Sequence, residues 1–83
     1  MSDVKLVLRE LICEHGALAP DFDPTANLYL DLGLPSMKAM LLLAEIEDRF
    51  GVAVPDDDYV VAASLDALAA LVGRLVSERD GSA

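Results

Sequence analysis

The sequence predicts an all-α fold, a small four-helix bundle with a long first loop and a short third helix. Apolar residues recur at helical spacing in three segments, Gly and Pro separate these segments, and strand patterns are nearly absent. The one strand-like stretch, residues 52–54, is too short and is followed directly by Pro55. Because 83 residues suffice for one small core, we expect residues 1–83 to form a single domain.

The first helix is expected to end at Gly16. Its apolar positions at helical spacing, with the histidine that closes it, are Val4, Val7, Leu8, Leu11, Ile12 and His15. The next segment, up to Pro35, is too rich in Gly, Pro, Asp and Asn for one regular element. A loop this long needs anchors, and a short helical turn capped by Asn27 is the candidate. The anchoring side chains are predicted to be Leu28, Leu30, Leu32 and Leu34.

Three further helices follow the loop. The second is predicted from Ser36 to Phe50, ended by Gly51. The third is predicted over residues 56–62, where an acidic first turn suits the positive end of the helix dipole. Ser64 is expected to cap the last helix. The apolar stripe of this last helix consists of Leu65, Leu68, Leu71, Val72, Leu75 and Val76.

Composition excludes several functional classes. Fifteen acidic residues against six Lys and Arg give a net charge of −9, which argues against nucleic-acid binding, because that binding needs clustered positive charge. The longest apolar run, residues 39–44, is too short to cross a bilayer, so no membrane partner is predicted. Cys13 is the only cysteine, and residues 1–5 do not resemble a signal peptide. We therefore expect a cytoplasmic protein, and a monomer.

The second helix is apolar on more than one face. On a helical wheel one stripe contains Ala39, Leu42, Leu43, Ile46 and Phe50, which is enough to pack against two neighbours. Roughly opposite lie Met37, Met40, Leu41 and Ala44, together with Asp48. In one interpretation the long loop covers Met40 and Leu41 and makes them core. In the other, Met37, Met40 and Leu41 stay exposed around Ser36 as a docking surface for a partner.

Ser36 lies at the start of this helix, where a serine is most often an N-cap. A hydrolase is not indicated, since the only histidine, His15, belongs to another helix and no Gly-x-Ser-x-Gly motif surrounds Ser36. The acidic stretches do not predict a metal site either. Residues 21–32 lack the glycine and the closing glutamate of a calcium loop, and residues 56–58 are typical of solvated charge at a helix start.

Two sequence motifs, which follow one another along the chain, resemble those of a known protein family. The segment 30–37, Leu-Asp-Leu-Gly-Leu-Pro-Ser-Met, is followed by an acidic stretch before Phe50 and by a short run that ends in Pro55 and Asp56. This sequence resembles acyl and peptidyl carrier proteins, whose pattern is a leucine-glycine turn, an Asp-Ser-Leu or Asp-Ser-Met attachment motif, acids before a phenylalanine, and a proline followed by acids. The resemblance covers nearly the whole chain.

The resemblance implies a non-enzymatic carrier. Ser36 would receive 4′-phosphopantetheine from coenzyme A through a magnesium-dependent phosphopantetheinyl transferase. The thiol of this arm would hold an acyl or aminoacyl group as a thioester and present it to a loading ligase or synthetase and to downstream transferases. Met37, Met40, Leu41 and Asp48 would face these partners.

The sequence departs from the family pattern in two ways. Pro35 stands where the family usually has an aspartate that helps the transferase recognise the site. Lys38 and Leu41 stand where many fatty-acid carriers have acids, so partner contacts near Ser36 are expected to be more apolar, as in specialised stand-alone carriers. The alternative hypothesis is a protein-interaction module that keeps the carrier fold without phosphopantetheine.

Overall fold

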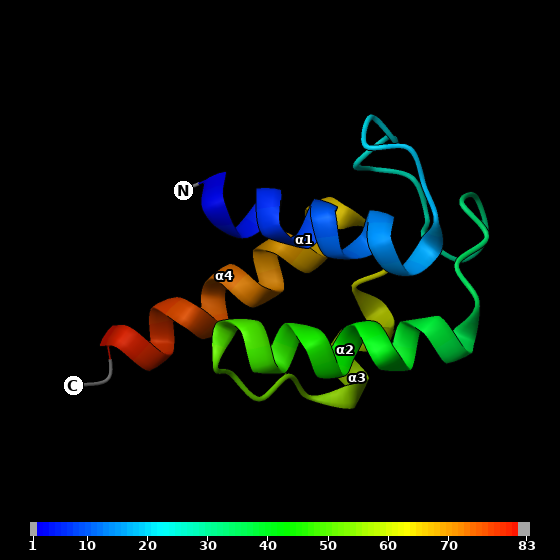
Figure 1. The fold of residues 1–83 in the computed structure, drawn as a ribbon. Coiled ribbons are helices and arrows are strands. Elements are labelled where there is room, and N and C mark those ends of the chain that lie inside the picture. The colour runs from blue at the N-terminus through cyan, green and yellow to red at the C-terminus, as the bar shows by residue number, and fades with distance from the viewer. Residues whose placement is uncertain (1, 82–83) are drawn as a thin grey trace.

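The computed structural model describes residues 2–81, which form four α-helices (Figure 1). These are α1 (Ser2–Gly16), α2 (Ser36–Phe50), α3 (Asp56–Val61) and α4 (Leu65–Gly81). No strand occurs within residues 2–81, so the predicted all-α class, the long first loop and the short third helix are confirmed. The third helix is shorter than predicted, because Ala62 leaves helical geometry, with φ −79° and ψ 74°.

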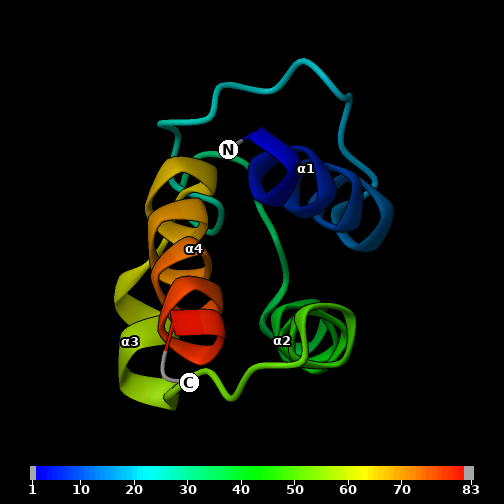
Figure 2. The same cartoon turned by 90° about the vertical axis from the view of Figure 1, so that its left-hand side faces the viewer.

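The helices are not packed equally against one another. Helix α1 packs against both α2 and α4, and α3 packs on α4 more closely than on α2. Figure 2 shows α3 and α4 side by side, with α2 on the other side of the bundle. The eight largest side chains that are fully buried form the centre of the core, and they are Leu8, Ile12, Leu28, Leu42, Ile46, Leu65, Leu68 and Val72.

The long loop is anchored from its interior. Leu28 and Leu34 are buried, and the N–H of Leu28 donates to the carbonyl of Ala63 at 2.7 Å, which ties the loop to the α3–α4 connection. As predicted, Asn27 caps a short turn, since its Oδ1 accepts the N–H groups of Tyr29 and Leu30 at 2.9 Å. This capping oxygen holds the turn in the conformation that buries Leu28.

The prediction was wrong for Leu30, which is 86% exposed. Residues two apart in a helical turn point in nearly opposite directions, so a turn that buries Leu28 directs Leu30 outward. Leu32 is half-buried against the core.

The helix ends mostly follow the sequence. Gly51 ends α2 with φ 64°, and its N–H donates to the carbonyl of Glu47. The hydroxyl of Ser64 accepts the N–H of Ala67 at the start of α4, as predicted. Helix α1 does end at Gly16, but the left-handed residue is Ala17, with φ 53°. None of the helices in residues 2–81 combines the length and the hydrophobicity that crossing a bilayer requires.

Candidate functional site

Ser36 is the first residue of α2, and it is not the N-cap that a serine in this context usually is. Pro35 occupies the cap position in extended geometry, with φ −67° and ψ 147°, and its carbonyl accepts the N–H of Ala39 at 3.0 Å. The fixed φ of proline suits this position, where its missing N–H costs no helical hydrogen bond. The consequence is that the hydroxyl of Ser36 is not used to cap the helix.

The start of α2 is open to an anion. No side chain caps it, and its first turn contains no acidic residue. Ser36, Met37 and Lys38 are all exposed, and the Ser36 hydroxyl makes no hydrogen bond with the described residues. Uncapped N–H groups and the helix dipole favour a negative group at this end of a helix. Lys38 adds a positive charge to the same turn.

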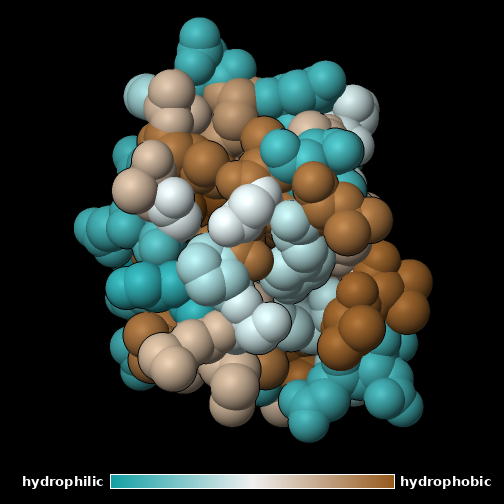
Figure 3. All heavy atoms as spheres, turned by 90° about the vertical axis from the view of Figure 1, so that its right-hand side faces the viewer, coloured by the Kyte–Doolittle hydropathy of each residue, from teal (hydrophilic) through white to brown (hydrophobic). Residues whose placement is uncertain are grey.

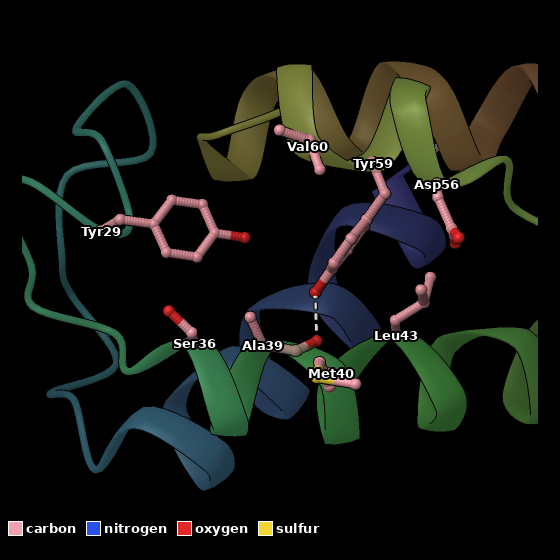
Figure 4. Close-up of a pocket in the computed structure, with 8 residues that line it drawn as sticks. All are labelled: Tyr29, Ser36, Ala39, Met40, Leu43, Asp56, Tyr59 and Val60. Carbon is pink, nitrogen blue, oxygen red and sulfur yellow. Dashed lines mark hydrogen bonds between the residues drawn. The ribbon is translucent and has the colours of Figure 1, made fainter.

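A groove of about 570 Å³ begins at Ser36 and lies between α2 and α3 (Figure 4). Among the side chains that line the groove, Ser36 and Tyr29 lie at one end and Asp56 lies towards the other end. The remaining lining residues, mostly apolar, are Ala39, Met40, Leu43, Tyr59 and Val60. The groove exists because α3 packs mainly on α4, which leaves the adjacent face of α2 only partly covered.

Tyr59 joins the two walls of the groove. Its buried hydroxyl donates a 2.7 Å hydrogen bond from α3 to the carbonyl of Ala39 in α2 (Figure 4). Burial raises the pKa of Tyr59 above its ordinary value, and the neighbouring hydroxyl of Tyr29 raises the pKa further, so the phenol stays neutral. Sequence reasoning did not single out Tyr29 or Tyr59, because they come from the loop and from α3 and meet only in the folded chain.

The apolar residues around Ser36 are exposed. Met37 is 75%, Met40 72% and Leu41 52% exposed, so the interpretation in which the loop buries Met40 and Leu41 was wrong. Asp48 is exposed further along α2, and on α3 Val60 and Val61 are exposed as well. Figure 3 shows hydrophobic side chains at the surface of the end of the molecule where α2 begins. This end therefore offers apolar contact area next to the free hydroxyl.

Among the described residues, the single histidine does not pair with Ser36. The imidazole of His15 lies instead 3.3 Å from Glu45 Oε1, between α1 and α2. Cys13 is half-buried, and its Sγ contacts the carbonyl of Ala19 at 3.6 Å. Burial raises the pKa of the Cys13 thiol, which keeps it protonated and a poor nucleophile.

Comparison with known proteins supplies the family. Residues 7–72 match the family model described as the phosphopantetheine attachment site. The acyl carrier protein of Zymomonas mobilis is 34% identical over 58 residues, which cover 69% of this chain and 74% of that protein. The chain belongs to the acyl carrier protein family. Like other members, this carrier is no enzyme, holds a covalent 4′-phosphopantetheine, and works with a phosphopantetheinyl transferase and acyl-handling enzymes.

The residues at the start of α2 fit this cofactor. A phosphodiester needs an accessible oxygen for attachment and donors for its charge, and Ser36 with the uncapped first turn of α2 provides both. An extended arm also needs a path along the protein, and the groove between α2 and α3 opens at the same serine.

Proposed function

We propose that this carrier holds an acyl or aminoacyl group as a thioester on a 4′-phosphopantetheine arm attached to Ser36. The observation that carries the proposal is the exposed and unbonded hydroxyl of Ser36 at an uncapped helix start. We further propose that residues 1–83 act as one domain and as a monomer.

The only other serine within the matched residues 7–72 is Ser64, which is less suited to attachment. Ser64 is half-buried, and its oxygen accepts the N–H of Ala67 as the cap of α4. Attachment there would remove the cap of α4 and would lower the stability of the protein by roughly 0.5–2 kcal/mol. Ser36 has no such structural task, which supports it as the attachment residue.

When bound, the arm supplies a thiol that forms a thioester with the cargo. The protein fixes the point where the arm is attached and provides the environment around the arm. The N–H groups of the first turn of α2 and the charge of Lys38 stabilise negative charge at Ser36. The apolar lining of the groove, braced by Tyr59, is available to shield a bound group from water.

Partner enzymes are proposed to dock on the exposed side of α2. Met37, Met40 and Leu41 supply flexible apolar contacts near the attachment point, and Asp48 supplies a charge that complements a basic patch. These enzymes are the phosphopantetheinyl transferase, the ligase or synthetase that loads the cargo, and the transferases that take it. Since Pro35 offers no carboxylate beside Ser36, the transferase relies on the apolar surface instead.

Intact-mass spectrometry tests this proposal directly. The purified carrier is incubated with coenzyme A, Mg²⁺ and a phosphopantetheinyl transferase of broad specificity. We expect wild-type protein to gain one phosphopantetheine group and Ser36→Ala to gain none. Ser77→Ala is the matched control, because Ser77 is exposed on α4 and outside the matched region. A wild-type carrier that stays unmodified with several transferases, or a Ser36→Ala variant that is still modified, would contradict the proposal.

A further inference from the structure

A second group of side chains, which could together bind a metal ion, lies away from Ser36. It combines Glu14 and His15, in the last turn of α1, with Glu45 of α2. One potential ligand atom from each of the three residues lies within 4.8 Å of the other two. The motif was not visible in the sequence, because Glu45 is 30 residues from its histidine neighbour.

The spacing of this group fits a tetrahedral metal ion. Zinc binds nitrogen and oxygen at about 2.0–2.2 Å, so neighbouring ligands of a tetrahedral site lie roughly 3.3 Å apart. The distance from His15 Nε2 to Glu45 Oε1 is 3.3 Å. Glu14 is exposed, and it has no ion pair or hydrogen bond with the described residues, so its carboxylate is able to close the remaining distance by a rotamer change.

The surroundings of the group also favour a cation. The side chain of His15 is only 16% exposed and that of Glu45 40%, so α1 and α2 hold these two ligands partly out of water. The ion pairs of Lys5 and Arg74 involve other acids, so these cations do not compete for Glu14 or Glu45. The net charge of −9 raises the local concentration of cations around the protein.

We propose that Glu14, His15 and Glu45 bind one Zn²⁺ ion, with water at the fourth position. An imidazole ligand selects zinc over Mg²⁺ and Ca²⁺, which prefer oxygen ligands alone and more of them. The ion joins the end of α1 to α2, the helix that carries Ser36, and so stabilises the folded chain. This inference does not depend on the arm or on its attachment residue.

Calorimetric titration of the tag-free, unmodified carrier with ZnCl₂ tests the site. We expect one equivalent to bind and the melting temperature to rise by about 4–8 °C at saturation. The imidazole NMR signals of His15, the only histidine, are expected to shift. The variants His15→Gln and Glu45→Gln each replace a proposed zinc ligand. We expect each to weaken zinc binding by at least roughly 10- to 100-fold, which is the loss typical when only an outer-sphere partner of a ligand is removed.

Three controls make the result decisive. Glu10→Gln removes one charge from an exposed position of α1, and Cys13→Ser removes the nearby thiol, and both are expected to bind zinc as the wild type does. Mg²⁺ or Ca²⁺ at the same concentration is expected to leave the His15 signals in place. The proposal is overturned if no zinc binds, if His15→Gln binds as tightly as the wild type, if Cys13→Ser loses the site, or if Mg²⁺ reproduces the effect.

Discussion

The two sides of α2 are similar in composition and opposite in environment. On one side Ala39, Leu42 and Ile46 are buried against α1 and the rest of the core. On the other, Met40 and Leu41 are 72% and 52% exposed, although both side chains are hydrophobic as well. Hydrophobicity therefore does not separate buried from exposed positions in this helix. What separates them is whether another element packs on that side.

The largest expected effect on stability is on the buried side. We expect Ile46→Ala to lower the free energy of unfolding by about 2–5 kcal/mol, because it removes a fully buried side chain and leaves a cavity. Met40→Ala is the matched control on the exposed side, with an expected change within about 0.5 kcal/mol. Urea unfolding curves measure both values. Equal losses in the two variants would show that the two sides do not differ as described.

A smaller effect is expected where α3 meets α2. Tyr59→Phe removes the hydroxyl that donates to the carbonyl of Ala39, and we expect a loss of about 0.5–1.5 kcal/mol in the free energy of unfolding. The same variant is expected to perturb the NMR signals of groove residues such as Leu43. A variant as stable as the wild type, with unchanged groove signals, would show that this hydrogen bond does not brace the groove.

The same tyrosine predicts a pH dependence. The pKa of Tyr59 is raised in the folded state, so its stabilising contribution is complete below the unfolded value near 10 and decreases as the pH rises above it. We expect the wild type to lose stability more steeply than Tyr59→Phe above about pH 10. Urea unfolding at a series of alkaline pH values compares the slopes, and parallel slopes would contradict the burial of this phenol.

The smallest effect on stability is expected at the exposed side, where the effect on function is large. Met37→Glu and Leu41→Glu are expected to change the free energy of unfolding by less than about 0.5 kcal/mol, because both side chains already face water. Both are expected to slow modification by the transferase, because each places a charge on the surface of the carrier where we propose that the transferase docks. A large fall in melting temperature, or an unchanged rate of modification, would show that these residues do not form a docking surface.

Local signals in the sequence predicted much of the fold. The bounds of α2 were predicted correctly, because Pro35 and Gly51 are strong helix boundaries. The caps made by Asn27 and Ser64 were also predicted, since both depend on side chains that bond to nearby backbone.

Features that depend on distant parts of the chain could not be predicted. The exposure of Met40 and Leu41 depends on the path of the loop, which helical periodicity does not determine. Tyr29 and Tyr59 line the same groove, and His15 lies beside Glu45, only because separate elements fold together. The prediction for Leu30 was wrong because spacing by two residues does not give one face in a helical turn.

The location of the phosphopantetheine arm decides whether Ser36 is the attachment residue. Protein treated with coenzyme A and a transferase is digested, and its peptides are mapped by tandem mass spectrometry. We predict that phosphopantetheine is found on the peptide that contains Ser36, the free hydroxyl between the exposed side of α2 and the groove. Its attachment to Ser64 or to another residue, with Ser36 unmodified, would contradict this assignment.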